Sequence, residues 1–397
     1  MYLLSLPTIA ARHDSRRPPG DPRRVLRVDA IVSRVMAVRA CGGAMALVGL
    51  LASSACTHRP PADFDPSRVA SLSCRQWPAS GDAAPAWIAP SDVNSRFRLS
   101  RWCETVGPIF FQGRPAAAAG SVETLAIVSW NVHEGGGDVD DLVRRLRGGE
   151  LTAGMPVEHF VLLLQEATRR ENGVAMRAPR GYPAPRRIAS QPSRSDGDIR
   201  RFAEEGYAVL YAPSMSNGTA DGSAEDRGNA IVSTLPLQEP RLIELPFERQ
   251  RRVVVAAALE GRRASGAPWR LELVNVHLDT ALALFHGGPF EARRRQAAAL
   301  LDALETFPAY HAGEAAAVIA GDFNTWRGDG EAAVKLLRTE FPGTPMEDGA
   351  PTWTGPLGVH ATLDHILVRG RVSTSRVTRL PSRFGSDHYP LLTVVHF

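Results

Sequence analysis

Carboxylate, amide and imidazole side chains recur in this sequence at the points where short apolar runs end. Asn131 lies at the end of one run, Glu166 at the end of another, and Asp322 and Asn324 follow a third. Carboxylate and amide oxygens are the ligands that Mg²⁺ and Mn²⁺ prefer, and histidines can transfer protons near neutral pH. The pattern is therefore typical of a site that holds a divalent cation beside a phosphoryl group.

Three further apolar runs have polar residues of the same kind at one end. The run LELVNVHLD ends in Asn275, His277 and Asp279, LDHILV begins with Asp364, and Ser386, Asp387 and His388 precede the last run. Burying such groups without partners costs roughly 2–7 kcal/mol each. One such residue is easily explained by a turn, whereas six runs marked in this way indicate that their ends share one rim.

The apolar runs have the length and composition of strands. Each is rich in β-branched residues and has turn residues nearby, and the runs are Leu125–Val132, Phe160–Gln165, Asn229–Thr234, Arg252–Leu259, Trp269–Leu278, Ala316–Gly321, Asp364–Arg369 and Pro390–Phe397. Helical patterns cover Val139–Arg147 and Pro289–Thr306, and residues 168–228 resemble a long loop. Buried strands mixed with helices favour a layered α/β domain.

Seven short motifs follow one another in the second two thirds of the chain. They are SWNVH, LLLQE, GNAIVS, NVHLD, GDFN, LDHI and SDHYPL. In this order they resemble the endonuclease/exonuclease/phosphatase superfamily, which includes pancreatic-type deoxyribonucleases, abasic-site endonucleases, neutral sphingomyelinases and inositol-polyphosphate phosphatases. The resemblance covers residues 124–397. It implies an α/β fold, a four-layer α/β/β/α sandwich of two packed mixed sheets flanked by helices, with the site at one rim.

The resemblance also implies roles for individual residues. Glu166 matches the metal-binding glutamate, Asn131 the asparagine beside metal and phosphate, and Asp387 a residue near the metal, which is Mg²⁺ (or Mn²⁺). His388 matches the catalytic histidine and Asp364 the aspartate that orients it. The remaining matches are Asp322, which aligns or activates water, Asn324, which contacts phosphate, and His277, which protonates the leaving oxygen or holds a phosphate oxygen.

Several polar residues are left with two readings or none. Asn275 supports His277 or only packs, and Asp279 is a second metal ligand or a loop charge. Arg227 is a candidate substrate-binding residue and Arg252 could act in the same way, although in an arginine-rich chain both could simply be solvated. No role follows from the sequence for His133, Glu134, His286 and His365.

The front of the chain has the layout of an export signal. Arg34 and Arg39 precede an apolar run, Ala40–Leu51, and a small-residue stretch that ends at Cys56. This is the order of a secretory signal, and its end resembles that of bacterial lipoproteins, in which the cysteine is lipidated. A plain signal peptide or a short membrane anchor is the alternative. The expected location is the cell envelope, in the periplasm or lipid-anchored in the outer membrane, or outside the cell.

The resulting domain division has four parts. Residues 1–35 are a leader that either precedes a true start at Met36 or is disordered. Residues 36–56 are the signal, residues 57–120 are a tether and lead-in, and residues 121–397 are the catalytic domain. Cys74 and Cys103 are the only cysteines after the signal, and in an oxidising compartment they either form a disulfide or stay as two thiols.

Charge bears on the substrate. The chain has a formal net charge of +4, and residues 1–55 with eight Arg and three Asp hold +5 of it, which leaves +4 − 5 = −1 for the rest. Enzymes that grip long nucleic acids usually carry a positive surplus, so this balance weakens a nuclease reading. We expect a metal-dependent phosphoesterase that acts on a phosphodiester or phosphomonoester. Nucleic acid, phospholipid or sphingomyelin headgroups and inositol phosphates remain open substrates, and a non-catalytic envelope binding module is the alternative of another class.

Overall fold

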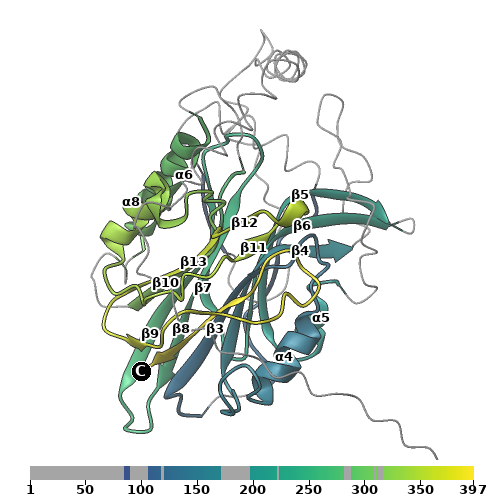
Figure 1. Cartoon of the computed structure of the whole chain (residues 1–397). Helices are drawn as coiled ribbons and strands as arrows, with labels where there is room; N and C mark the ends of the chain where they lie inside the picture. The colour runs from purple at the N-terminus through teal and green to yellow at the C-terminus, as the bar shows by residue number, and fades with distance from the viewer. Residues whose placement is uncertain are drawn as a thin grey trace, which may run out of the picture. The chain divides into compact units, whose positions relative to one another are not determined.

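Two β-sheets packed face to face form the centre of the described part of the chain (Figure 1). The computed structural model describes residues 85–89, 106–117, 120–170, 197–220, 223–280, 288–307, 310 and 316–397. They all belong to the unit that spans Ala62–Phe397. The predicted leader and signal, with Cys56, and the pair Cys74 and Cys103 lie outside the described residues, as does His286.

The larger sheet has eight strands and the smaller one six. The larger consists, in spatial order, of β14 (Ser373–Thr374), β16 (Leu391–His396), β3 (Thr124–Asn131), β4 (Phe160–Arg170), β6 (Ser223–Ser233), β5 (Ala208–Ala220) and β2 (Phe110–Gln112), with β15 (Thr378–Arg379) beside β16. The smaller consists of β1 (Ala86–Ile88), β7 (Gln238–Glu244), β8 (Val253–Arg262), β9 (Pro268–His277), β10 (Ala316–Asp322) and β13 (Asp364–Arg369). A separate hairpin pairs β11 (Trp353–Thr354) with β12 (His360–Ala361).

Helices cover the outer face of each sheet. On the larger sheet, α4 (Val139–Arg147) and α5 (Arg201–Glu204) contribute Leu142, Leu146 and Phe202 to a core that also holds Val128 and Trp130 of β3. On the smaller sheet, α6 (Gly288–Leu304) and α8 (Ala332–Glu340) share a second core with strands β8, β9 and β10. A third core lies between the sheets. The predicted four-layer α/β/β/α sandwich is thereby confirmed.

The side chains of β3 explain why the strands have apolar residues on both faces. Leu125 and Ile127 point into the core between the sheets, while Ala126, Val128 and Trp130 pack under α4 and α5. Successive side chains of a strand point to opposite faces, and here each face meets another apolar layer. A strand buried on both faces is a near-continuous apolar run, which is the pattern seen in the sequence.

The prediction of a loop over residues 168–228 is wrong for its described second half. There β5 and β6 form a long hairpin with register shifts between Pro213 and Met215 and between Ser216 and Gly218. Its buried residues include polar ones such as Asn217 and Asp226, which bond to other residues of the fold. Bulges and buried polar pairs remove the alternation by which strands are recognised.

Short strands also come from the part of the chain expected to be a tether and lead-in. Within residues 57–120, β1 pairs in parallel with β7 and β2 pairs antiparallel with β5. Each has three residues and lies at the edge of its sheet, so neither is long enough to show a period in the sequence. None of the helices in the described ranges is both long and apolar enough to cross a membrane.

Candidate active site

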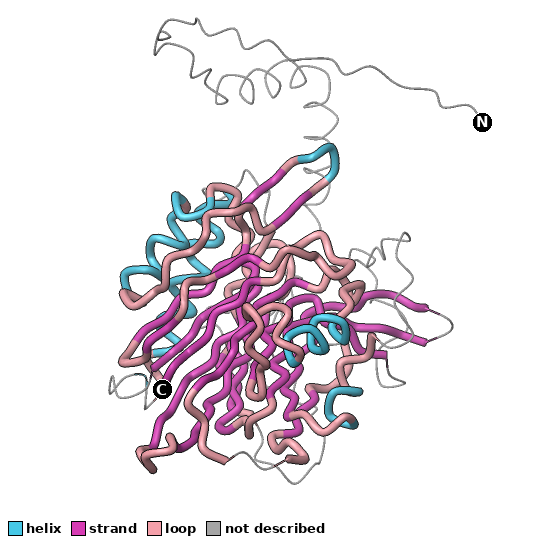
Figure 2. The backbone as a smooth tube through the Cα atoms, turned by 60° about the horizontal axis from the view of Figure 1, so that its bottom comes forward, coloured by secondary structure: helices cyan, strands magenta, loops and turns pink. Residues whose placement is uncertain are grey.

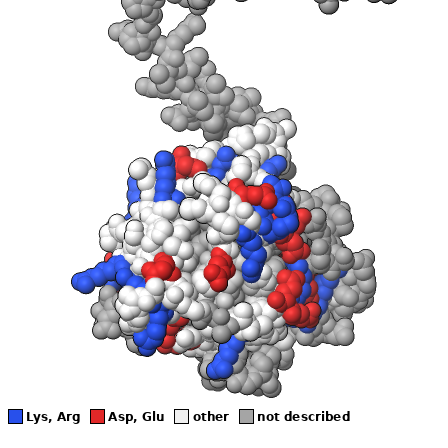
Figure 3. Space-filling view, turned by 90° about the horizontal axis from the view of Figure 1, so that it is seen from below, with Lys and Arg blue, Asp and Glu red and all other residues white. Residues whose placement is uncertain are grey.

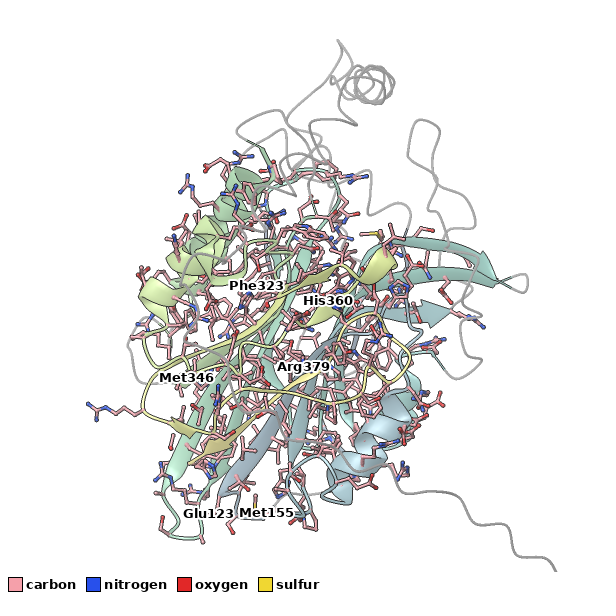
Figure 4. The ribbon with its side chains drawn as sticks, viewed as in Figure 1. Glu123, Met155, Phe323, Met346, His360 and Arg379 are labelled. Atoms are coloured by element: carbon pink, nitrogen blue, oxygen red, sulfur yellow. The ribbon has the colours of Figure 1, made fainter. Side chains whose placement is uncertain are left out.

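The strand directions bring the predicted site residues to one rim. Strands β3 and β4 run parallel, as do β9 and β10, so their carboxyl ends point the same way. Strands β13 and β16 run antiparallel to β10 and β3 and therefore begin where those strands end. In Figure 4, Glu123 before β3 and Met155 before β4 lie at the far end from Phe323, which follows β10. The polar strand ends therefore share an edge.

Asp322 lies at the centre of this rim. It pairs in register with His277 on β9 and with Asp364 on β13. Asn131 reaches across from the larger sheet, and its Nδ2 donates to Asp322 Oδ2 at 3.0 Å. The Nε2 atoms of His277 and His388 lie 3.4 and 3.8 Å from the same oxygen. One carboxylate thus joins groups from both sheets.

His388 is held as one half of a buried pair with Asp364. Its Nδ1 lies 2.8 Å from Asp364 Oδ2, and its backbone carbonyl accepts a hydrogen bond from Trp130 Nε1 at 3.1 Å. Burial alone would lower the pKa of His388, but the charges of Asp364 and Asp322 raise this pKa to about 10. The histidine is therefore a cation at neutral pH, with Nε2 directed toward Asp322.

The acid–base state of Asp322 is also shifted. Burial and the charge of Asp364 raise the pKa of Asp322 to about 6, against the charge of His388 and hydrogen bonds from Asn324 and Asn131. By contrast, burial and the charges of Arg252, His388 and Arg227 lower the pKa of His277 well below its usual value. Asp322 is thus a carboxylate that can take a proton near neutral pH, while His277 is a neutral imidazole.

Glu166 occupies a bulge that aims it at the rim. It has φ +56°, and the register between β4 and β6 shifts between Leu164 and Ala167. Its Oε2 accepts a hydrogen bond from the backbone N–H of Glu134 at 3.2 Å. Burial raises the pKa of Glu166, and the charge of Arg252 opposes this. Strained backbone of this kind is found where surrounding structure fixes a functional group.

Asp387 lies on the loop that leads into β16. Its Oδ2 accepts a hydrogen bond from Trp353 Nε1 at 2.9 Å, and its Oδ1 lies 3.0 Å from His133 Nδ1. Burial acts to raise the pKa of Asp387, but His133 and the charge of His388 lower it to about 2. The side chain is therefore an anion throughout the physiological range.

The oxygen-bearing side chains fit a hard divalent cation. The charge of Asp387 adds to the burial that raises the pKa of Glu166, so these two like charges act on each other. A second group, Asp322, Asp364 and His388, has one ligand atom from each residue within 4.8 Å of the others. Carboxylates that raise one another's pKa values in this way are stabilised by a bound cation.

Two arginines supply positive charge at the same rim. Arg252 is buried, its Nε has no hydrogen-bond partner among the described residues, and its charge interacts with those of Asp279, Glu166 and Asp322. Arg227 forms an ion pair with Glu134 and donates to Asn217 Oδ1 at 3.0 Å. Burial and the charge of Arg252 lower the pKa of Arg227 to about 10. Both arginines are therefore held by contacts within the fold and are not solvated surface residues.

His133 and Glu134, to which sequence reasoning gave no role, contact site residues directly. They and Gly135 have φ of +48°, +55° and +75°, so the chain turns sharply after β3. This turn places His133 on Asp387 and Glu134 on Arg227. The signal available in the sequence was the run HEGGG immediately after Asn131, since glycine marks backbone that needs left-handed conformations.

Asn275 and Asp279 have structural partners. Asn275 Nδ2 donates to the carbonyls of Leu164 and Ala230, and its Oδ1 accepts from Gln165 Nε2, at 2.8, 2.8 and 2.7 Å. Its hydrogen bonds thus join the two sheets, and of the two alternatives left open by the sequence the structure shows the packing role. Asp279 Oδ2 accepts from the backbone N–H of Arg249 and Gln250, which anchors the loop before β8.

Asn324 lies within the site loop as well. It has φ +53°, its backbone N–H donates to Asp322 Oδ1 at 2.8 Å, and its Nδ2 donates to the carbonyl of Leu278 at 2.9 Å. The predicted site residues are therefore brought together, on loops and strand ends from both sheets.

A layered α/β/β/α sandwich with acidic, amide and histidine groups at one rim defines a class of proteins. Comparison with known families identifies this class. The model of the endonuclease/exonuclease/phosphatase family matches residues 128–388. The chain belongs to this family, as its motifs suggested. Its members are generally metal-dependent phosphoesterases that act on substrates such as nucleic acids.

Similar solved structures share less than a fifth of their residues with this chain. They include an endonuclease/exonuclease/phosphatase from Beutenbergia cavernae, with 16% identity and a TM-score of 0.46 over 70% of this chain and 72% of that one. A family protein from Leptotrichia buccalis has 14% identity and a TM-score of 0.45, covering 69% and 100%. The human Nocturnin catalytic domain, with a bound sulfate anion, has 17% identity and a TM-score of 0.43, covering 73% and 97%. No curated protein matches the chain.

Proposed function

We propose that the protein is a Mg²⁺-dependent phosphodiesterase that works by in-line attack of water on a phosphoester. The observation that carries the proposal is that Asn131 and the Asp364–His388 pair converge on one buried oxygen, Oδ2 of Asp322. The charges of Glu166 and Asp387 act at the same rim. In-line displacement at phosphorus requires a positioned water, a cation on the phosphoryl oxygens and a charge-stabilising group, and these residues are of the required kinds.

The residues divide the work as follows. Glu166 and Asp387, with Asn131, would hold Mg²⁺ (or Mn²⁺), which when bound neutralises charge on the phosphoryl oxygens. Asp322, whose pKa is about 6, accepts the proton of the attacking water. The His388 cation, oriented by Asp364, stabilises negative charge that develops in the transition state. Neutral His277 holds a phosphate oxygen through a ring N–H, and the His388 cation can supply the proton that the leaving oxygen takes up.

Phosphate binding falls to the basic and amide groups that surround this centre. Arg252 has a buried Nε that finds no hydrogen-bond partner in the described part of the chain, and Arg227 is fixed by Glu134 and Asn217. A guanidinium held in place loses little freedom when it binds an anion. Asn131 and Asn324 complete the set of substrate-contacting residues. We assign Arg227 and Arg252 to the non-bridging oxygens of the substrate.

A specific observation favours a phospholipid or sphingolipid headgroup over a long nucleic acid as the substrate. Trp326 packs edge-on against Trp353, whose indole bonds to Asp387, and Trp326, Leu357 and Val359 are exposed apolar side chains. Figure 2 shows the hairpin of β11 and β12 standing out from the sheets, with the short helix η3 (Pro356–Gly358) at its tip. Exposed apolar groups beside a reaction centre suit a substrate with an apolar part.

The charge distribution agrees with this preference. The chain after residue 55 has a formal net charge of −1, from +4 − 5. Nucleic-acid enzymes usually carry a surplus of positive charge. Figure 3 shows the end of the molecule opposite the rim, where basic and acidic side chains of the described residues are interspersed. We therefore favour lipid headgroups over nucleic acid as the substrate. Soluble inositol phosphates are a third candidate substrate and are included in the test below.

The test uses the purified full-length chain with Mg²⁺. Plasmid DNA, sphingomyelin vesicles and an inositol phosphate are supplied in parallel, together with bis-p-nitrophenyl phosphate and p-nitrophenyl phosphate to separate diester from monoester hydrolysis. His388→Ala should abolish turnover, whereas Asp302→Asn, at an exposed position of α6, should leave it unchanged. Removal of Mg²⁺ with a chelator should stop the reaction. Absence of turnover on all five substrates would favour the non-catalytic envelope binding module.

We further propose export to the cell envelope through a lipidated Cys56. The support is the order of Arg34, Arg39, the apolar run Ala40–Leu51 and Cys56 in the sequence. Mass spectrometry of the chain isolated from membranes should find an acylated N-terminal peptide that begins at Cys56, and Cys56→Ser should release the protein into the soluble fraction. An unmodified chain that still begins before residue 34 would refute export by this route.

A further inference from the structure

A second group of metal-ligating side chains lies on the other face of the smaller sheet. His365 follows Asp364 on β13, and neighbouring residues of a strand point to opposite faces. Its ring lies 5.2 Å from that of Phe323, which belongs to the core under α6 and α8. Asp329 of the short helix η2 (Gly328–Gly330) and Glu347 of the loop after α8 complete the group.

The distances within this group are longer than hydrogen bonds. His365 Nδ1 lies 3.5 Å from Glu347 Oε1 and 3.8 Å from Asp329 Oδ1. His365 is fully buried, and neither its Nδ1 nor Glu347 Oε1 has a hydrogen-bond partner among the described residues. A buried nitrogen without a partner costs free energy. Because Nδ1 of His365 faces two carboxylate oxygens, a cation bound to all three atoms would remove this cost.

The other nitrogen of the ring is already held. His365 Nε2 lies 2.9 Å from Thr325 Oγ1, and this hydroxyl can donate to the carbonyl of Thr362 at 3.4 Å. If the hydroxyl hydrogen goes to that carbonyl, Oγ1 accepts from Nε2–H and Nδ1 keeps its lone pair. Metal-ligating histidines in general donate their other ring N–H to a hydrogen-bond acceptor, which fixes the tautomer.

The spacing fits a shared cation. Ligand atoms about 2.1 Å from an ion and at tetrahedral angles lie about 3.4 Å from one another. The separations of 3.5 and 3.8 Å are close to this value. One imidazole nitrogen with two carboxylate oxygens is a donor set that suits Zn²⁺.

We propose that His365, Glu347 and Asp329 form a second divalent-cation site, of the Zn²⁺ class and separate from the catalytic rim. Asp329 is exposed, which leaves space for water as a further ligand. The bound ion ties η2 and the loop at Glu347 to strand β13. It thereby braces Asp364, the neighbour of His365 in sequence, and Thr325, which follows Asn324.

Arg338 of α8 competes for the same carboxylates. Its Nη2 lies 2.9 Å from Asp329 Oδ1 and 3.7 Å from Glu347 Oε1. The two carboxylates and the one guanidinium together carry one negative charge. A divalent ion must then work against the arginine, so removal of this positive charge should strengthen cation binding. A simple ion-pair network predicts no such gain.

The test measures Zn²⁺ itself on the full-length chain. Bound Zn²⁺ is counted by elemental analysis after equilibrium dialysis, for Glu347→Gln and for the control Glu340→Gln, an exposed acid on α8. Glu347→Gln, which keeps the size of the side chain, should bind one Zn²⁺ fewer than the control, and so should the exposed variant Asp329→Asn. Arg338→Gln should bind the same number of ions as the control, with at least threefold higher affinity at this site.

Equal Zn²⁺ counts in Glu347→Gln and Glu340→Gln would overturn the proposal, and so would weaker Zn²⁺ binding in Arg338→Gln. Either result would make the group an ion-pair network. His365→Gln provides a spectroscopic check with Co²⁺ in place of Zn²⁺, because loss of a nitrogen ligand changes the visible absorption of the bound ion. None of these variants alters a residue assigned to the catalytic rim, so the outcome does not depend on the proposed phosphodiesterase activity.

Discussion

At the scale of single residues, the protonation states of the site depend on pairs of side chains. His388 is a cation because Asp364 and Asp322 outweigh the effect of burial, and Asp322 takes up a proton near pH 6 because it is buried beside Asp364. Groups whose pKa values are pushed apart in this way can serve as acid and base at one pH. Their division of roles therefore depends on Asp364, which need not touch the substrate.

Asp364→Asn should lower the pKa of His388. The carboxylate of Asp364 is the strongest influence that raises this pKa, so its removal lets burial lower it. The imidazole then spends less time as a cation near neutral pH, and turnover should fall by a factor on the order of 10²–10⁴. The pKa is measured by following the His388 ring signal in an NMR titration. An unchanged titration midpoint, with Asp302→Asn as the reference, would contradict the assigned pairing.

The residue types at the rim were predictable from the sequence, but their partners were not. Asn131, Glu166, Asp322 and His388 each end or follow a buried run, so their type and place identify them. The contacts of His133 with Asp387 and of Glu134 with Arg227 depend on left-handed backbone after β3. Polar groups brought together by a turn leave no periodic pattern in the sequence.

At the scale of the elements, close approach between β9 and β10 sets the position of Asp322. Gly321 has φ +151°, and a Cβ atom built there would lie 1.7 Å from the carbonyl oxygen of Val276. The strands can therefore meet at this point only where the residue before Asp322 has no side chain. This gives the glycine of the GDFN motif a physical reason that is separate from the chemistry of its aspartate.

Gly321→Ala should accordingly destabilise the fold by more than about 3 kcal/mol, since the strands must separate or the backbone must change conformation. Chemical denaturation monitored by tryptophan fluorescence gives the free energy of unfolding. Gly120→Ala, whose added Cβ meets nothing within 4 Å, is the matched control and should change it by less than about 0.5 kcal/mol. Similar stabilities for the two variants would show that the strands can be rearranged without cost.

Two asparagines hold the sheets together near the rim. Asn275 of β9 bonds to carbonyls of β4 and β6, and Asn229 of β6 donates to the carbonyl of Val253 on β8 at 2.8 Å. Their amides are buried in the contact between otherwise apolar faces. Buried polar groups that are fully bonded fix one arrangement of the surrounding elements.

Asn275→Ala should lower the free energy of unfolding by about 2–4 kcal/mol, because Gln165 and two backbone carbonyls lose a buried partner, at about 1–3 kcal/mol for each unsatisfied group. Activity should fall as well, since the site draws on both sheets. Urea denaturation is compared with that of Gln238→Ala, an exposed amide on β7. A loss no larger than that of Gln238→Ala would mean that water replaces the missing amide.

The elements themselves were predictable where packing is regular. The buried strands β3, β9 and β10 and the helices α4 and α6 follow from apolar period and length, whereas the hairpin of β5 and β6 does not. Its strands carry Ser216, Asn217, Glu225 and Asp226 at buried positions. Asn217 bonds to Glu225, and arginines of β4 and β6 bond to Asn217, Glu225 and Asp226. No single-strand pattern records this stabilisation.

At the scale of the whole molecule, the small net charge makes a prediction about salt. With +4 for the full chain, or −1 without residues 1–55, long-range attraction to a polyanion is weak. A protein with 6–10 phosphate contacts loses about 10³–10⁵ in affinity between 50 and 200 mM salt. For this chain, affinity for single-stranded or duplex DNA should change by less than about tenfold over that range. A steep slope in fluorescence-anisotropy binding curves would instead reveal a local basic groove.

The two asparagines that bridge the sheets also limit how this protein can accommodate its substrate. Each sheet contributes part of the reaction centre, with Asp322 on one and Asn131 on the other, and the amide contacts prevent the two halves from separating. A bulky substrate therefore cannot be admitted by a hinge motion through the middle of the sandwich. Selectivity must come from segments that extend beyond the strands, such as the tip of the hairpin of β11 and β12. Exchange of the tip alone, Pro356–Gly358, should redirect specificity while Trp353 keeps its hydrogen bond to Asp387.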